Sequence, residues 1–298
     1  MGITRQQSVD FQVVIIDNAS ADSTVEWIRQ NYNVVSSPTR NPLYNDINQN
    51  KGPLPNVEAT GDVVLIQNQT NQGFAAGHNQ GFAICEAPYV LVLNPDTELQ
   101  AGYLEEVVRI MESAAPLTLT LSQRERGLPD GRIAAVQGKL YRELPKQGNS
   151  GIIDSCGLQM KPYGQVVDIG QNSVEKAEFG LGEAHRTPHP SPLPEGEGVV
   201  EIWGATGACA FYRLEALKQV ADKHGIFDER FGSYKEDVDL AWRLKLAGWK
   251  AVFTPGAIAW HGRRVGKGDR RTWKIRYLSF RNHILMVGKN LRKLVVRN

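Results

Sequence analysis

Three polar side chains each follow an apolar run that has the character of a β-strand: Asp17 after residues 12–16, Asn71 after 63–66 and Asp96 after 89–93. Where parallel strands alternate with helices, ligands bind beyond the carboxyl ends of the strands, so these three positions are expected to converge on one site. Pro95 stiffens the turn Asn94-Pro95-Asp96, so that the Asp96 carboxylate projects from the sheet edge. A lone Asp in such a turn ordinarily only stabilises it.

An acidic cluster and a histidine add further chemistry in the second half of the chain. Glu236-Asp237-Val238-Asp239 begins an amphipathic helix predicted over residues 238–247. Acidic residues in a first turn complement the helix dipole, which explains Glu236 or Asp239 but does not single out Asp237. His261 follows the apolar run 257–260, a place where an isolated histidine is more often structural than a ligand.

The elements that position these residues follow a repeated order of strand, polar turn and helix in the first half of the chain. This order predicts an α/β fold with a mostly parallel, Rossmann-like sheet and flanking helices. The second half is mixed, with a hairpin expected over residues 152–170 and a strand leading into and out of the small residues 204–208. Residues 36–61, 116–131 and 185–198 are rich in Pro, Gly, Asn or charge and are predicted to be surface loops, the last two resembling translated bacterial repeat elements.

Composition excludes several classes of protein. The 298 residues are 41% hydrophobic and 22% charged, which is typical of a globular enzyme and not of a disordered, collagen-like or coiled-coil chain. The sequence has no apolar stretch of membrane-spanning length and its first residues are polar, so a cytoplasmic location is expected. Cys85, Cys156 and Cys209 are odd in number and far apart, and they are interpreted as buried small side chains rather than a disulfide or zinc framework.

The C-terminal tail differs in charge from the rest of the chain. Residues 263–298 hold twelve Lys or Arg and one Asp, a net charge of +11, whereas the whole chain carries +2, so residues 1–262 carry −9. Within this tail an apolar stripe recurs at helical spacings of three and four: Tyr277, Phe280, Ile284, Val287, Leu291 and Leu294. Packing of the stripe onto the catalytic domain is one interpretation, and peripheral attachment to an anionic membrane surface is the alternative. No recognised nucleic-acid-binding fold accompanies the charge, so nucleic acid is not expected as a partner.

Taken together, the strings VVIIDNASADST, NQGFAAGHNQG, YVLVLNPDTEL, GATGACAFYR, FDERFGSYKEDVDLAWRLKLAGW and AWHG resemble the family 2 glycosyltransferases, which have the GT-A fold. The motifs are most similar to the rhamnosyltransferase-like branch. The resemblance runs in order from about residue 5 to residue 290, apart from the three loops, and it implies a catalytic domain over 1–262 followed by a basic amphipathic helical tail over 263–298.

The resemblance implies a metal site for a divalent cation, Mn²⁺ or Mg²⁺. Asp96 corresponds to the metal-binding carboxylate of the family's DXD motif, in which Asn94 replaces the first acidic residue. His261 corresponds to the second protein ligand, and an imidazole suits Mn²⁺ better than Mg²⁺. The metal neutralises the charge of the departing nucleoside diphosphate, so the reaction needs no protein acid on the leaving group.

The remaining site residues also take their roles from the resemblance. Asp237 is implied as the general base that takes the proton of the acceptor hydroxyl in an inverting displacement. On the donor side the resemblance implies nucleotide-sugar contacts for Asp17, Asn71, Gly73, Asn79 and Asn94. On the acceptor side we expect Gly204, Ala205 and Glu236, although small residues such as 204–208 are as often a sign of tight packing. Arg243 is interpreted as a salt-bridge residue.

These implications predict an enzyme that moves a sugar, with rhamnose preferred, from a dTDP- or UDP-sugar to a glycan or lipid-linked acceptor in cell-surface polysaccharide synthesis. Its expected place is the cytoplasm, at the inner face of the plasma membrane. Family members normally begin with a buried strand of the type VSVVIVTYN and a helix, whereas this chain starts inside that helix, so a non-catalytic remnant is the alternative. A nucleotidyltransferase would share the sheet and the metal, but its glycine- and lysine-containing loop is not visible near the N-terminus.

Overall fold

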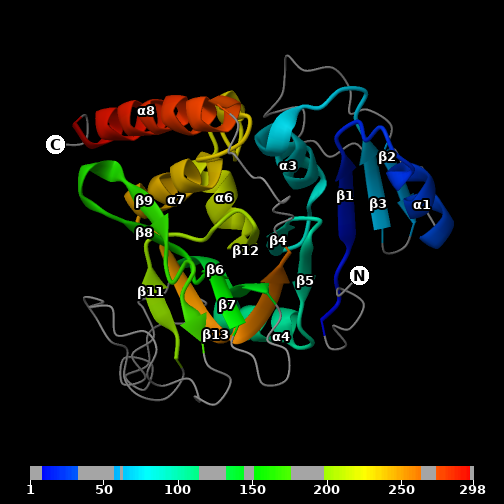
Figure 1. Cartoon of the computed structure of the whole chain (residues 1–298), viewed down its shortest axis with the longest axis horizontal. Helices are drawn as coiled ribbons and strands as arrows, with labels where there is room; N and C mark the ends of the chain where they lie inside the picture. The colour runs from blue at the N-terminus through cyan, green and yellow to red at the C-terminus, as the bar shows by residue number, and fades with distance from the viewer. Residues whose placement is uncertain are drawn as a thin grey trace. The chain divides into compact units, whose positions relative to one another are not determined.

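The structure is a computed structural model that describes residues 9–32, 57–60, 63–113, 132–143, 151–175, 198–262 and 273–295 (Figure 1). The chain forms two compact units. Most of unit 1 is Pro88–Val220 and Asp237–Asn298, and unit 2 consists of Asp10–Ala87 and Ala221–Glu236. Within the described residues, no helix is long and apolar enough to cross a membrane.

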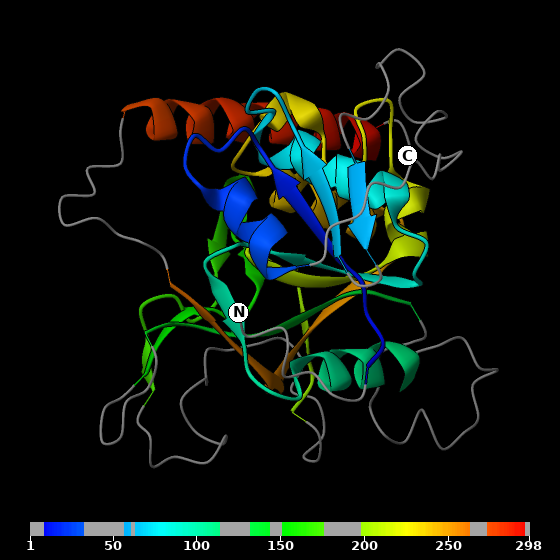
Figure 2. The same ribbon diagram turned by 90° about the vertical axis from the view of Figure 1, so that its right-hand side faces the viewer.

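Unit 2 is a three-stranded sheet with a helix on each face (Figure 2). Its elements are β1 (Val13–Asp17), α1 (Thr24–Asn31), β2 (Val57–Thr60), β3 (Val63–Gln67), α3 (Gly73–Ile84) and the 3-10 helix η3 (Glu229–Phe231). Side chains alternate along β1, so Ile15 packs with α1 on Leu65, whereas Ile16 lies against Gly77 of α3. The apolar run of β1 is therefore continuous because both of its faces are covered.

Unit 1 is built on an eight-stranded sheet, in which β12 lies between β4 and β6 and β13 pairs with β6, β5 and β11. The strands of this sheet are β4 (Tyr89–Leu93), β5 (Thr97–Leu99), β6 (Ile133–Glu143), β7 (Gly151–Ser155), β10 (Val174–Glu175), β11 (Val200–Ile202), β12 (Cys209–Arg213) and β13 (Lys250–His261). A separate two-stranded sheet is formed by β8 (Leu158–Met160) and β9 (Val166–Asp168). The helices of unit 1 are α4 (Tyr103–Ser113), η2 (Pro162–Gly164), α6 (Leu214–Val220), α7 (Glu236–Leu246) and α8 (Trp273–Val295).

The α/β class is confirmed, but the expectation of a mostly parallel sheet is wrong for this chain. Of the ten pairings between described strands, β1 with β3 and β6 with β13 are parallel and the others are antiparallel. Alternation of strand and helix, which predicts parallel pairing, extends along the chain only as far as α4. Beyond it, the described residues contain no α-helix between β6 and β12, and strands that follow one another directly commonly pair antiparallel.

Several local expectations are confirmed. The hairpin is formed by β8 and β9 around η2, and α7 ends just before Gly248, whose φ is +87°. Cys156 and Cys209 are buried free thiols, Cys85 is half-buried, and burial raises the pKa of Cys209 to about 12.

The three predicted loops lie almost entirely outside the described residues. The exception is residues 57–60, for which a loop is the wrong prediction. They form β2, because the backbone there pairs with β3 from Val57 opposite Ile66 to Thr60 opposite Val63.

Candidate functional site

The pairing of β13 with β5 brings His261 next to Asp96. His261 lies opposite Thr97 in the antiparallel register, and the Gly262 amide donates a 2.8 Å hydrogen bond to the Asp96 carbonyl oxygen. A register shift in β13 between Thr254 and Ile258 precedes this segment. As a result, Nε2 of His261 lies 3.3 Å from Oδ1 of Asp96.

The imidazole of His261 is oriented from its other side by Asp154 of β7. Nδ1 lies 2.8 Å from Oδ2 of Asp154, whose side chain is 1% exposed. Asp154 also accepts a 3.1 Å hydrogen bond from Nη2 of Arg142, as a carboxylate does. Because a carboxylate only accepts, the hydrogen of this contact lies on Nδ1, and Nε2 is the ring nitrogen that faces Asp96. Nδ2 of Asn94 lies 3.3 Å from the same nitrogen.

This arrangement fits a divalent cation. With its hydrogen on Nδ1, a neutral ring would offer the Nε2 lone pair as a ligand beside Oδ1 of Asp96. Two neighbouring ligands of a six-coordinate ion at about 2.1–2.2 Å are roughly 3 Å apart, close to the distance seen here. Within the described residues, no group of three His, Cys, Asp or Glu side chains is placed to hold an ion. The roles of Asp96 and His261 as metal ligands stay predictions.

Asp237 lies in the first turn of α7, where backbone amides fix its carboxylate. Gly207 N–H donates to Oδ2 at 3.0 Å, and Val238 N–H donates to Oδ1 at 2.8 Å. The residue is half-buried, so it is neither sealed in the core nor free to rotate at the surface.

The segment between β11 and β12 connects Asp237, the predicted base, to the turn that holds Asn94 and Asp96. Gly207 holds Asp237, and the carbonyl oxygen of its neighbour Ala208 accepts a 2.9 Å hydrogen bond from the Asn94 amide. Gln137 of β6, which is fully buried, accepts from Thr206 N–H at 3.0 Å and donates to Cys209 O at 3.1 Å. This hydrogen-bonded segment thus links the predicted site residues Asn94, Asp96, His261 and Asp237.

Among the predicted acceptor residues, Gly204 has a structural explanation in its packing. A Cβ on Gly204 would lie 2.4 Å from Cβ of Ala241 in α7, so close packing alone requires a glycine there. Ala205 and Glu236 are both buried, with 1% and 6% exposure. Contact of these three residues with an acceptor stays a prediction.

The last residues of unit 2 before α7 have a strained backbone conformation. Tyr234 and Lys235 both have φ of +74°, a left-handed backbone conformation that residues with a Cβ rarely adopt. A strained backbone persists only where the surrounding structure holds it in place, and such residues cluster in functional loops.

The predicted nucleotide residues of unit 2 gather at the ends of β1 and β3, as the topology predicts. Asp17 is 4% exposed, and its carboxylate accepts from Ser20 N–H at 3.2 Å. Asn71 Oδ1 accepts from Gly73 N–H at 2.9 Å, and Gly73 has φ of +82° with the Gly232 carbonyl oxygen 3.1 Å from where a Cβ would be.

The side chain of Asn79 is hydrogen-bonded to the backbone of Phe227 within the same unit. Its Nδ2 donates to Phe227 O at 2.8 Å and its Oδ1 accepts from Phe227 N–H at 3.0 Å. The amide therefore holds the segment around Phe227 as a neighbouring strand would. Nucleotide contacts of Asp17, Asn71, Gly73 and Asn79 stay predictions.

Sequence reasoning missed four residues that order these sites: Asn18, Asn68, Gln137 and Asp154. Asn68 Nδ2 donates to Asn18 Oδ1 at 2.9 Å, and Asn18 Nδ2 donates to Gly73 O at 3.1 Å. The available signal for Asp154 was a carboxylate following the apolar Ile152 and Ile153. Arg243 does form the expected salt bridge, 2.8 Å from Asp239.

Comparison with known proteins identifies the fold as that of the GT-A glycosyltransferases. The chain is similar to the solved structure of GalNAc-T7 with UDP, GalNAc and Mn²⁺, with 12% identity and a TM-score of 0.54 over 93% of this chain and 41% of that chain. A mannosyltransferase from Pyrobaculum calidifontis in complex with GDP-Man and Mn²⁺ is 15% identical with a TM-score of 0.47, covering 98% of this chain and 58% of that one.

The sequence comparisons define the family. The model of the family described as Glycosyl transferase family 2 matches residues 2–221, and that of Glycosyl transferase family group 2 matches residues 196–287. The chain belongs to glycosyltransferase family 2. An N-acetylglucosaminyl-diphospho-decaprenol L-rhamnosyltransferase of Mycobacterium tuberculosis is 43% identical over 63 residues, which is 21% of this chain and 19% of that protein. The match thus spans about a fifth of the curated relative.

Proposed function

We propose that the protein is an inverting, metal-dependent glycosyltransferase that moves a sugar from a nucleoside-diphosphate sugar to a glycan or lipid-linked acceptor. The observation that supports this proposal best is the placement of Asp96, His261 and Asp237 around the segment Gly207–Ala208. A base and a pair of metal ligands placed around one segment would be the two parts that such a reaction needs.

Asp237 is the proposed general base. Each of its oxygens accepts one backbone hydrogen bond and keeps a further lone pair, so the carboxylate can take the proton of an acceptor hydroxyl. The acceptor oxygen forms a bond to the anomeric carbon while the bond from that carbon to the diphosphate oxygen breaks. The electron pair leaves with the nucleoside diphosphate, and one displacement inverts the configuration.

Asp96 and His261 are the proposed ligands for Mn²⁺ or Mg²⁺. When bound there, the cation supplies positive charge to the diphosphate leaving group. Asn94, which precedes Asp96 in the same turn, is a proposed contact of the nucleotide sugar. The GT-A neighbour GalNAc-T7, described with UDP and Mn²⁺, supports this proposal.

Rhamnose is the donor sugar that we propose, carried by dTDP or UDP. Support comes from the M. tuberculosis relative, whose name describes transfer of L-rhamnose to an N-acetylglucosaminyl-diphospho-decaprenol. A water-soluble donor and a lipid-linked acceptor meet at a membrane surface. We therefore place the reaction in the cytoplasm, at the inner face of the plasma membrane, in cell-surface polysaccharide synthesis.

The proposal is tested first by calorimetric titration of the folded chain with UDP and with dTDP, each with and without Mn²⁺. Metal-dependent binding of one nucleotide is expected, and it would select the donor for a transfer assay with dTDP- or UDP-rhamnose and a polyprenyl-diphospho-N-acetylglucosamine acceptor. Absence of nucleotide binding by a sample that melts cooperatively would overturn the proposal in favour of a non-catalytic protein.

A further inference from the structure

The helix α8 turns its apolar side chains outward. Five large apolar residues are exposed to solvent, and their spacings of four, three, four and seven residues place them on one face of the helix. We call this face the α8 stripe: Trp273 (79% exposed), Tyr277 (55%), Phe280 (65%), Ile284 (56%) and Leu291 (47%). Packing of the sequence-predicted stripe onto the catalytic domain is therefore wrong for Tyr277, Phe280, Ile284 and Leu291.

The opposite face of α8 combines polar residues with the half-buried Ile275, Leu278 and Leu285, and it packs on the rest of unit 1. Asn282 and Asn290 are fully buried, as is Met286. Val287 and His283 approach Gly164 of η2, so Val287 of the predicted stripe points inward. The side chain of Leu294 lies outside the described residues.

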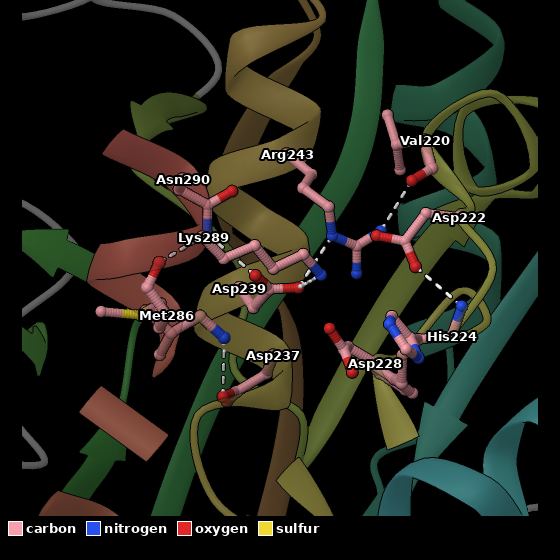
Figure 3. Close-up of polar contacts among 12 residues, drawn as sticks. Val220, Asp222, His224, Asp228, Asp237, Asp239, Arg243, Met286, Lys289 and Asn290 are labelled. Carbon is pink, nitrogen blue, oxygen red and sulfur yellow. Dashed lines mark hydrogen bonds and ion pairs between the residues drawn. The ribbon is translucent and has the colours of Figure 1, made fainter. Parts of the chain in front are cut away.

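Polar contacts with α7 fix this orientation (Figure 3). Asp239 Oδ2 accepts from Lys289 Nζ at 3.0 Å, and Oδ1 accepts from Asn290 Nδ2 at 2.8 Å. Arg243 donates to the same carboxylate at 2.8 Å and to Val220 O at 2.8 Å. A rotation of α8 that buried the α8 stripe would leave the buried Asp239 without its partners on α8, which is unfavourable.

The charge around the α8 stripe indicates what covers it. The helix contains six Lys or Arg and no Asp or Glu. Arg276 is exposed, and Arg276 and Arg281 lie on either side of the apolar face by helical periodicity. An apolar face bordered by cations, with Trp and Tyr among its residues, is typical of helices that lie in the interface of an anionic bilayer. The chain's net charge of +11 over residues 263–298 agrees with such a surface.

We propose that α8 lies flat on an anionic lipid surface, with Trp273, Phe280 and Ile284 inserted at the boundary between headgroups and acyl chains. The inference goes beyond the proposed function, because the helix would bind lipid whether or not the chain transfers sugar. A helix held in this way would keep unit 1 at the surface where a lipid-linked acceptor is found.

The experiment is co-sedimentation of the full chain with vesicles of phosphatidylcholine that contain about 30% phosphatidylglycerol, against vesicles of phosphatidylcholine alone. Binding to the anionic vesicles is expected, and it should fall when the salt is raised from about 0.1 M to about 0.5 M. Phe280→Glu and Trp273→Glu should each weaken partition by about tenfold or more, since each inserts a charge into the interface.

Trp27→Glu is the matched control, because Trp27 is an exposed tryptophan (45%) on α1, outside the α8 stripe. This variant should bind vesicles as the unchanged chain does. Circular dichroism and a thermal melt show whether each variant is folded, and binding of nucleotide without vesicles tests the proposed function separately.

Two results would overturn the proposal. One is binding of folded Trp273→Glu and Phe280→Glu to anionic vesicles as tightly as the unchanged chain. The other is no vesicle binding together with a dimer in sedimentation velocity that Phe280→Glu dissociates, because the α8 stripe would then be an interface between two copies of the chain.

Discussion

The imidazole of His261 is held between two carboxylates, with Nδ1 2.8 Å from Asp154 and Nε2 3.3 Å from Asp96. These carboxylates differ in environment, since the Asp154 side chain is 1% exposed and that of Asp96 is 35% exposed. Asp154 is therefore a partner that fixes the ring, and Asp96 is the carboxylate that solvent can reach. Such an outer partner commonly tunes a histidine ligand of a metal.

We expect Asp154→Asn to weaken Mn²⁺ binding by about 10- to 100-fold, because an amide holds the ring less strongly and makes Nε2 a poorer donor. The measurement is a Mn²⁺ titration in the presence of nucleotide, followed by electron paramagnetic resonance of the free ion. Asp96→Ala should weaken binding further, since it removes a ligand. Asp222→Asn, in unit 2, is the control and should titrate normally. An unchanged Mn²⁺ affinity in folded Asp154→Asn would show that the contact has no part in metal binding.

Asp237→Asn should abolish transfer while leaving donor binding nearly intact. The amide can still accept a hydrogen bond from Gly207 N–H, but it cannot take the proton of the acceptor hydroxyl. Transfer is measured with radiolabelled donor, and donor binding by calorimetry with Mn²⁺. Turnover within about tenfold of the unchanged chain would refute the base assignment.

The sequence predicts those features that local patterns encode. Runs of apolar residues and the polar turns after them identify β1, β3 and β4 and place Asp17 and Asp96 at strand ends, because side-chain periodicity depends on near neighbours. Long-range pairing is different. That β12 lies between β4 and β6, and that His261 lies opposite Thr97, depends on which distant strands meet.

The partners of the site residues were equally beyond local patterns. Asp154 is 107 residues from His261 in sequence, and Gln137 is 69 residues from Thr206. The direction of the apolar face of α8 also could not be read from its spacing. Spacing shows that Phe280 and Ile284 share a face of the helix. Which face points inward is determined by the hydrogen bond between the buried Asn290 and Asp239.

The ion pairs between α7 and α8 should stabilise the fold unequally. Asp239→Asn leaves the buried Arg243 and Lys289 without their anion, and we expect it to lower the free energy of unfolding by about 3–5 kcal/mol. Lys289→Met leaves Asp239 paired with Arg243 and should cost only about 1 kcal/mol. The control is Lys245→Met, which removes an exposed pair with Glu201 and should change stability by less than about 0.5 kcal/mol. Urea unfolding measures all three, and equal losses for Asp239→Asn and Lys245→Met would contradict the assigned role.

His78 should make the stability of unit 2 depend on pH. Burial lowers the pKa of His78 below its usual value of 6.5, although its contact with Phe74 O opposes the shift. Below pH 6.5 the unfolded chain binds a proton at this position that the folded chain does not, so the stability is fully present above 6.5 and is lost as the pH falls below it. His78→Phe keeps a ring against Phe74 and Phe227 but cannot titrate. Between about pH 7.5 and 5.5 the unchanged chain should lose more unfolding free energy than this variant. Equal pH dependence of the two proteins in urea unfolding would show that His78 is not the group responsible.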